Sequence, residues 1–248
     1  MIPKVIHYCW FGGRPLPESA QRCIRSWQRF LPDCEIRRWD ESNYDINAVL
    51  YTRQAAEKGK WAFVSDYARF DVLYRYGGIY FDTDVEAIAP FDDVVAAGAF
   101  MGWEKSPLGV AVNPGLGMGA EPSLSFFREV LDYYARTPYL DPNGNILPGT
   151  VVKHVTDLLL SHGLILENDS QCVAGITVYP SEYFNPLDDA TGRITLTPNT
   201  HSIHHYDKSW CDDYGPIRTR VMRALHRWFG TDIFSRIRKF SAIWKKNH

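Results

Sequence analysis

The chain has 248 residues, of which 45% are hydrophobic and 14% aromatic, and its formal net charge is −2. This length and apolar content are enough for one α/β domain with a sizeable core, and the near-neutral charge excludes a general affinity for nucleic acid. Five cysteines without a CxxC spacing argue against a disulfide framework or a zinc site and favour a reducing compartment. No apolar stretch approaches the roughly 20 residues of a membrane span, and the short apolar run after Lys4 is not that of a signal peptide.

Strand and helix patterns alternate along the first third of the chain. The predicted strands are residues 5–10 and 35–39, and the predicted helices are residues 17–32, 46–57 and 61–76. Such alternation predicts a mostly parallel sheet with helices on both faces. Ligands of such sheets bind beyond the carboxyl ends of the strands.

The stretch from Ser65 to Asp84 is the most informative part of the sequence, and it predicts a helix, a glycine turn and an apolar strand. Gly77-Gly78 marks the helix end, because glycine tolerates the left-handed cap conformation. Asp82 and Asp84 end the strand, where residues two apart share a face. Two carboxylates beside apolar structure are costly to bury unless a cation lies between them. Because Mg²⁺ and Mn²⁺ favour oxygen ligands, the pair predicts a site for a divalent cation and a diphosphate.

Asp66 and Arg69 are three residues apart and therefore neighbours on one face of the predicted helix. One interpretation is a surface ion pair, and the other is a pair that points into a polar ligand site.

The pattern changes after residue 98. Residues 100–103 predict another strand, and residues 123–136 and 151–162 predict amphipathic helices. The segment Asn113–Gly119 is too glycine-rich for the interior of an element, and it lacks the GxxxxGK[ST] pattern of a phosphate loop. We therefore expect it to be a flexible loop.

Four segments together resemble the DXD-containing sugar transferases of glycosyltransferase family 32. They are residues 2–13, similar to the family's first strand and nucleotide loop; 65–84, similar to its donor-sugar helix and DXD strand; 176–186, similar to a late strand and turn; and 203–210, similar to its closing metal-ligand motif. The resemblance spans about residues 1–212. It implies a GT-A-like α/β domain, whose catalytic fold is shared with the large clostridial glucosylating toxins. On this resemblance the glycine-rich segment 113–119 would lie on the acceptor side.

The resemblance also implies individual roles. Trp10 stands where the family stacks the nucleotide base, and the alternative is a core tryptophan. Asp66 and Arg69 would hold donor-sugar hydroxyls and phosphate. Asp82 would meet the ribose or a metal-bound water, and Asp84 would ligate the metal directly.

The closing motif offers further candidates. His204 and His205 are adjacent, so on extended backbone one can reach the metal while the other packs, and the spacing of five to Trp210 favours His205. Lys208, where many relatives have a small residue, is expected to contact phosphate, and Trp210 is expected to contact the donor. Tyr80 shares the strand face of the two acids and would either touch the donor or pack in the core.

These features predict a metal-dependent glycosyltransferase that uses Mn²⁺ or Mg²⁺ and moves a sugar from a nucleotide-sugar donor to a glycan or lipid-linked acceptor. A divalent cation would stabilise the charge of the departing nucleoside diphosphate. The resemblance implies retention of anomeric configuration, and no residue is assigned as a nucleophile. Trp10 and the toxin resemblance favour a UDP-sugar, with GDP-mannose as the alternative. Because Golgi members of the family need a membrane anchor, we expect a bacterial cytoplasmic enzyme of capsular polysaccharide or lipopolysaccharide synthesis.

Two other hypotheses stay open on the sequence. A haloacid-dehalogenase-like phosphohydrolase also carries Asp-x-Asp after an apolar strand, but there the pair lies near the N-terminus and is followed by Thr or Val and by later Ser/Thr, Lys and paired-acid motifs. Val85 fits the first of these features poorly, and a position near residue 82 is late. A non-catalytic sugar- or membrane-binding module is the third, and the intact set of acids, arginine and paired histidines argues against it.

The C-terminal segment 215–248 differs from the catalytic domain predicted for residues 1–214. It holds nine Lys or Arg and one acid, so its net charge is +8 against −10 for the preceding residues. Apolar and aromatic residues recur at helical spacing, which predicts a basic amphipathic helix lying peripherally on the anionic inner face of the cell membrane. The alternatives are a helix packed on the domain with a solvated basic face or, without any recognised motif, a nucleic-acid contact.

Overall fold

The computed structural model of the chain describes residues 1–106, 109–207 and 223. The described helices are α1 Glu18–Phe30, α2 Leu50–Glu57, α3 Trp61–Tyr76, α4 Asp92–Ala96, the 3₁₀ helix η1 Pro114–Leu116, α5 Ser125–Arg136, α6 Val151–Ser161 and α7 Ser181–Phe184. The described strands are β1 Val5–Cys9, β2 Glu35–Trp39, β3 Gly78–Tyr80, β4 Val85–Ala87, β5 Phe100–Ser106, β6 Gly109–Val112, β7 Met118–Ala120, β8 Gln171–Val173, β9 Ile176–Tyr179, β10 Leu187–Asp188, β11 Arg193–Ile194 and β12 Ser202–His204.

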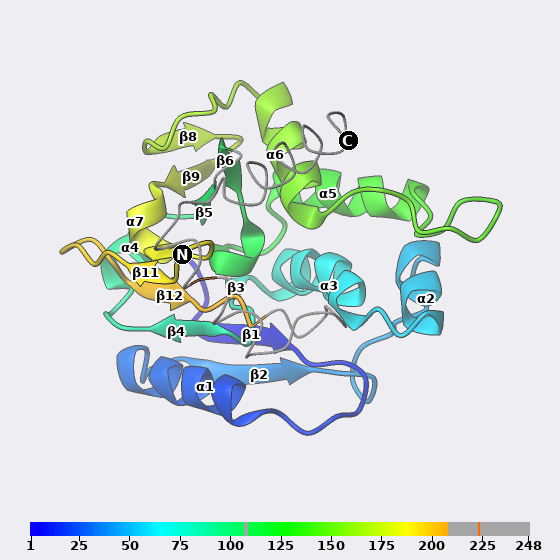
Figure 1. Cartoon of the computed structure of the whole chain (residues 1–248), viewed down its shortest axis with the longest axis horizontal. Helices are drawn as coiled ribbons and strands as arrows, with labels where there is room; N and C mark the ends of the chain where they lie inside the picture. The colour runs from blue at the N-terminus through cyan, green and yellow to red at the C-terminus, as the bar shows by residue number, and fades with distance from the viewer. Residues whose placement is uncertain (107–108, 208–222, 224–248) are drawn as a thin grey trace, which may run out of the picture.

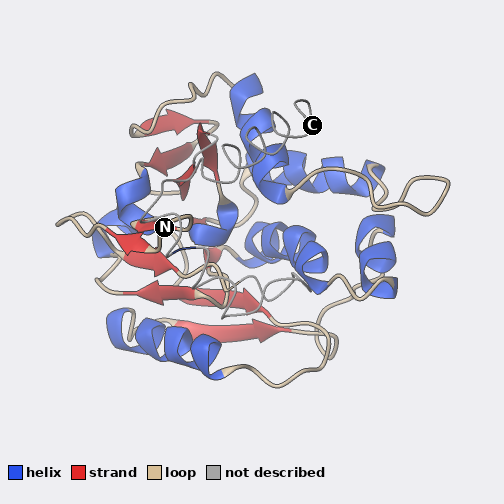
Figure 2. Ribbon diagram, in the orientation of Figure 1, coloured by secondary structure: helices blue, strands red, loops and turns tan. Residues whose placement is uncertain are grey.

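An eight-stranded mixed sheet runs through the molecule in the order β2-β1-β3-β7-β5-β9-β8, with β6 paired to β5 (Figures 1 and 2). Strands β2, β1 and β3 are parallel neighbours, and β5 and β9 are parallel to each other. Strand β7 is antiparallel to both β3 and β5, so β5 and β9 run in the same direction as β3. The prediction of a mostly parallel α/β sheet is therefore confirmed, with β6, β7 and β8 as the strands of opposite direction.

Apolar cores lie on both faces of this sheet because alternate strand residues point to opposite sides. On β3, Ile79 belongs to a cluster that packs under α1 and the ribbon of β4, whereas Tyr80 belongs to the larger cluster under α2, α3, α5 and α6. Trp27 of α1 is fully buried in the first cluster, and its indole nitrogen donates to the Val85 carbonyl oxygen at 2.7 Å. Helices thus cover both faces, as the alternating pattern predicts.

Helix α3 ends where the glycine pair predicts. The Gly77 nitrogen donates to the Leu73 carbonyl oxygen at 2.8 Å, and Gly77 has φ 63°, a conformation that a side chain would strain. A Cβ at this position would also lie 2.6 Å from Pro122. The turn therefore fixes the point at which the chain leaves α3 and enters β3.

The glycine-rich segment 113–119 is not the flexible loop that its composition suggests. It forms η1 and the first part of β7, which lies in the centre of the sheet between β3 and β5, and every residue from Asn113 to Gly119 is buried. Small residues are required here because neighbouring chains approach closely. A Cβ on Gly119, for example, would lie 2.4 Å from the Phe100 ring.

The two acids of the Asp-x-Asp motif do not lie on a strand, which corrects the sequence interpretation. Strand β3 ends at Tyr80, and a turn closed by the Val85 nitrogen on the Asp82 carbonyl oxygen, at 3.1 Å, redirects the chain into β4. Strand β4 then pairs antiparallel with β12 as a separate two-stranded ribbon.

Most of the predicted C-terminal segment lies outside the described residues. Its one described residue is Arg223, whose guanidinium donates to the Asp189 carboxylate at 2.9 Å and to the Asp189 carbonyl oxygen at 3.1 Å. This contact ties Arg223 to the domain. None of the helices in the described part of the chain combines the length and apolar character needed to cross a membrane.

Candidate metal centre and active site

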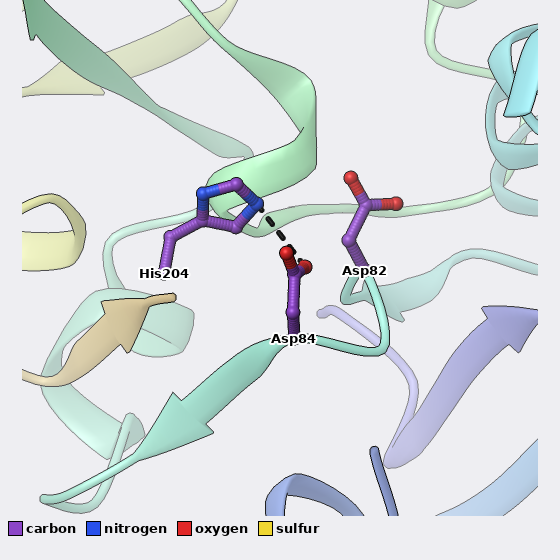
Figure 3. A group of neighbouring side chains, drawn as sticks. All are labelled: Asp82, Asp84 and His204. Atoms are coloured by element: carbon purple, nitrogen blue, oxygen red, sulfur yellow. Dashed lines mark ion pairs between the residues drawn. The ribbon is translucent and has the colours of Figure 1, made fainter. Parts of the chain in front are cut away.

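Asp82, Asp84 and His204 converge from two distant parts of the chain (Figure 3). One ligand atom from each lies within 4.8 Å of the others. The imidazole Nε2 of His204 lies 3.2 Å from a carboxylate oxygen of Asp84. His204 is buried and the two aspartates are half-buried, so the group is reachable from solvent on its acidic side.

The register of the β4–β12 ribbon brings the histidine to the acids. His204 pairs with Val85, the residue directly after Asp84, and the His205 nitrogen donates to the Asp84 carbonyl oxygen at 2.9 Å. The Asp207 nitrogen donates to the Asp84 carboxylate at 2.9 Å and holds it in place. Asp82 joins the group because the turn after β3 folds it back toward Asp84.

The donor set fits a divalent cation. Two carboxylates and an imidazole are ligands that Mn²⁺ accepts and, for the carboxylates, Mg²⁺ prefers. The buried Nδ1 of His204 has no hydrogen-bond partner among the described residues, although an unsatisfied buried nitrogen is costly. The other ring nitrogen, Nε2, faces Asp84 and is the one that would reach an ion shared with the two carboxylates (Figure 3). Asp82, Asp84 and His204 would therefore hold the ion.

Arg69 fixes Asp82 from the opposite side. Its two terminal nitrogens each lie 3.3 Å from a carboxylate oxygen of Asp82, and one of them also reaches Asp66 at 3.2 Å. Its Nε donates to the Ser65 carbonyl oxygen at 3.1 Å. The guanidinium is buried and lies 5.0 Å from the centre of the Tyr80 ring. This burial supports the interpretation of Asp66 and Arg69 as a pair in a polar ligand site, and not as a surface ion pair.

Burial dominates the chemistry of this pair. It raises the pKa of Asp66 to about 7, although the neighbouring Arg69 lowers it and Asp82 raises it further. Burial alone would lower the pKa of Arg69, but Asp82, Tyr80 and Asp66 raise it above its usual value, so the guanidinium stays charged. The site thus contains one permanent cation among three carboxyl groups.

The other predicted site residues divide into those near the centre and those away from it. Tyr80 is buried, and its hydroxyl donates to Asp82 at 3.1 Å, so it acts as support beneath the acid. His205 points away and contacts Glu86 at 2.8 Å, so the ligand assignment moves from His205 to His204. Trp10 is half-buried beside the α1 core, and its indole nitrogen donates to the Arg14 carbonyl oxygen at 2.6 Å.

Lys208 and Trp210, the two remaining predictions, lie outside the described residues. The four described cysteines are unpaired, in agreement with the expectation of no disulfide framework for that part of the chain.

The site has a further wall that the sequence did not indicate. Glu104 of β5 accepts from the Asn113 amide nitrogen at 3.0 Å and from the Tyr206 hydroxyl at 3.1 Å. Asn113 in turn accepts from the Gly115 nitrogen at 2.7 Å, and a Cβ on Gly115 would lie 2.3 Å from Asp82 and 3.3 Å from Arg69. The only available signal was the glycine-rich run itself, because glycine often marks a close backbone approach.

We expect metal affinity to rise with pH. Burial lowers the pKa of His204, but the adjacent Asp84 carboxylate more than offsets this and raises it to about 9 in the metal-free protein. A ligand must lose its proton before it can bind metal. Below about pH 9 the apparent Mn²⁺ affinity should therefore increase about tenfold per pH unit and then level off.

Calorimetric titration of the metal-free protein with Mn²⁺ between pH 6 and 9 measures this slope. His204→Gln, which cannot titrate, should bind more weakly and without the slope. An equal slope in both proteins would remove His204 from the ligand set.

Residues 17–101 match the family model described as glycosyltransferase sugar-binding region containing DXD motif. The resemblance inferred from the sequence is confirmed for this part of the chain, which is similar to a DXD-type glycosyltransferase sugar-binding region. It contains Asp66, Arg69, Asp82 and Asp84.

Curated relatives point in the same direction. The chain is 31% identical over 116 residues to inositol phosphoceramide mannosyltransferase 3 of Schizosaccharomyces pombe, covering 45% of this chain and 32% of the relative. It is 29% identical over 158 residues to mannosyl phosphorylinositol ceramide synthase SUR1 of Saccharomyces cerevisiae, covering 60% and 40%. The chain therefore spans well under half the length of these relatives.

Solved structures give weaker likenesses. The PaToxG glycosyltransferase superposes with a TM-score of 0.47 at 19% identity, covering 64% of this chain and 69% of that one. The galactosyltransferase LgtC with donor and acceptor sugar analogues gives 0.43 at 12% identity, covering 92% and 99%. At these scores the likenesses assign neither a function nor a topology.

Proposed function

We propose that the protein is a metal-dependent glycosyltransferase that moves a sugar from a nucleotide-sugar donor to a glycan or lipid-linked acceptor. The observation that carries the proposal is the convergence of Asp82, Asp84 and His204 beside the buried Asp66–Arg69 pair, within and next to a DXD-type sugar-binding region. A divalent cation bound there supplies positive charge for a departing diphosphate.

The chain's own residues would perform the remaining tasks. Arg69 has a planar fork that suits phosphate oxygens as well as carboxylates, and it already orients Asp82. Asp66, half-protonated near neutral pH, can both donate to and accept from sugar hydroxyls. We assign no residue of the metal centre as a nucleophile; transfer with retention would then proceed by an acceptor that attacks on the side of the leaving group.

A turnover assay with different nucleotide sugars tests both the donor and the need for a metal. Turnover of UDP- and GDP-linked hexoses should require Mn²⁺ or Mg²⁺ and should stop when the metal is removed with a chelator. The curated relatives are named for mannosyl transfer, which supports including GDP-mannose beside the UDP-sugars. If no nucleotide sugar is turned over or bound in the presence of either metal, the proposal is wrong.

Trp10→Ala should weaken nucleotide binding by about 1–3 kcal/mol if the base stacks on this indole. The half-buried position at the carboxyl end of β1 leaves one part of the ring accessible. Calorimetry with UDP and GDP in the presence of Mg²⁺ gives the difference, and the unfolding transition shows whether the variant is folded. An unchanged affinity in a folded variant would return Trp10 to a core role.

We also propose that residues 215–248 dock the enzyme on the anionic cytoplasmic face of a membrane, where lipid-linked acceptors of surface polysaccharide synthesis would be found. The support is the +8 charge beside repeated aromatic residues and the ceramide acceptor in the names of the relatives.

Truncation at Gly215 should abolish binding to anionic vesicles and spare turnover on a soluble acceptor, since no proposed site residue lies beyond Trp210. Added salt should weaken vesicle binding of the full chain, because it screens exposed charges. The membrane proposal is wrong if the full chain does not bind vesicles and the truncated chain unfolds. The segment would then be a structural helix packed on the domain, and the Arg223–Asp189 contact would be part of that packing.

A further inference from the structure

Polar side chains flank the metal centre in two arcs. On one arc, Arg69 joins Asp82 to Asp66. On the other arc, Glu104 joins two segments by accepting from Asn113, just before η1, and from Tyr206, two residues after β12. This second arc reaches the metal centre through Tyr206, whose phenol stands edge-on to the His204 imidazole at 4.3 Å between ring centres.

Glu104 has no ion-pair partner among the described residues. Among the described residues no Lys, Arg or His lies within ion-pair distance of it, and its two contacts come from a neutral amide and a neutral hydroxyl. An ionised carboxylate accepts about four hydrogen bonds, so about two acceptor positions are left for a ligand.

The backbone of Tyr206, which donates to Glu104, is strained. Tyr206 has φ 56°, a left-handed conformation that is strained for a tyrosine and typically found at functional sites. The strained residue is anchored by Asn185, whose amide nitrogen donates to the Tyr206 hydroxyl. The same Asn185 accepts from the Lys105 nitrogen at 3.3 Å. Asn185, at the end of α7, thus links β5 to the segment after β12 and helps to aim the Tyr206 hydroxyl at Glu104.

The two arcs differ in their access to solvent. Asp66 and Arg69 are 8% and 4% exposed. Glu104 is half-buried and begins the exposed end of the β5–β6 hairpin, where Lys105 and Ser106 are exposed. A glycan acceptor is large and must approach from solvent, whereas a single donor hexose can be enclosed. The exposed arc is therefore the one that suits an acceptor.

We infer that Glu104, held by Asn113 and Tyr206, binds hydroxyl groups of the acceptor sugar beside the metal centre. This inference rests on the proposed function and adds to it a subsite for a carbohydrate hydroxyl pair. Glu104 is a binding residue here and takes no part in bond breaking. The free lone pairs of its carboxylate accept from two sugar hydroxyls, as a charge-assisted contact stronger than a neutral one.

Saturation-transfer NMR on the full chain tests the subsite with methyl glycosides of glucose, galactose, mannose and N-acetylglucosamine, in the presence of Mg²⁺ and UDP or GDP. Glu104→Gln keeps the size of the side chain and removes its charge. Glu86→Gln is the matched control, because Glu86 is a nearby half-buried carboxylate that pairs with His205 and belongs to neither arc. Nucleotide affinity is measured on the same three proteins.

At least one glycoside should bind the wild-type protein, and Glu104→Gln should weaken it by about tenfold or more. The Glu86→Gln control should match the wild type, and all three should bind Mg²⁺–nucleotide alike. Equal glycoside binding by Glu104→Gln, an equal loss in the control, a parallel loss of nucleotide binding, or no glycoside binding to a wild type that binds nucleotide would each overturn the inference. A wild type that binds no nucleotide would overturn the proposed function and this subsite with it.

Discussion

Asp84→Asn is expected to lower turnover by about a thousandfold or more while leaving the fold intact. Asp84 is the acid that contacts His204 directly, and burial is outweighed by His204 and by the Asp207 amide, which lower the pKa of Asp84 to about 2. Asparagine keeps the shape and one acceptor oxygen for the Asp207 nitrogen but loses the charge that binds a cation. Metal ions supply several kcal/mol of charge stabilisation in such sites, and each 1.36 kcal/mol is tenfold in rate.

The chain offers a matched control for this variant. Asp93 also pairs with a histidine, His201 at 3.5 Å, but its side chain is 70% exposed and lies outside the metal centre. Asp93→Asn should keep wild-type turnover and Mn²⁺ affinity. Turnover assays and Mn²⁺ titration on both variants, with unfolding curves to check the fold, separate the outcomes. Near-normal Mn²⁺-dependent turnover by Asp84→Asn would disprove the metal assignment.

The sequence predicts those parts of the fold whose signals are local. Strand β2 and helix α3 have the bounds that the pattern predicts, because apolar periodicity and the glycine pair after Tyr76 are encoded within each segment. The acids of the motif were found for the same reason. Their place in a turn was not, because the end of β3 is set by its pairing with β1, from His7 opposite Tyr80, and not by its own residues.

Long-range pairing also explains why the histidine assignment could not be made from the sequence. Two adjacent residues on extended backbone point to opposite sides, and only the register of β12 against β4 decides which of them faces Asp84. The role of Glu104 was still harder to predict from the sequence, since its partners are Asn113, just before η1, and Tyr206, two residues after β12. No local pattern marks a carboxylate whose function depends on three separate segments.

Arg69→Met is expected to lower the free energy of unfolding by about 3–5 kcal/mol, the largest stability loss that we expect from a single site residue. Methionine fills much of the same space, but it leaves the carboxylates of Asp66 and Asp82 without their cation. The side chain of Arg69 is 5% exposed, so water cannot replace the lost contacts. Breaking a buried pair from one side is costly because the remaining charge stays buried.

The matched control is Arg128→Met on α5, where Arg128 pairs with Asp132 at 2.8 Å but is 59% exposed. An exposed pair of this kind contributes about 1 kcal/mol or less. Urea unfolding of the two variants compares a buried with an exposed ion pair in one protein. Equal losses would mean that Arg69 is solvated in solution and that its contacts with Asp66 and Asp82 are not buried.

The pH dependence of the loss identifies its cause. Because the pKa of Asp66 is raised from 3.8 to about 7, the folded protein holds a proton that the unfolded chain releases, so this group reduces stability as the pH rises across that interval. Without Arg69 the raising effect of burial is no longer opposed, so the pKa of Asp66 should rise further and the decline should extend to higher pH. The deficit of Arg69→Met should accordingly be smaller at pH 5 than at pH 8, whereas that of Arg128→Met should stay nearly constant. A deficit of Arg69→Met that is independent of pH would point to lost packing in place of an uncompensated carboxylate.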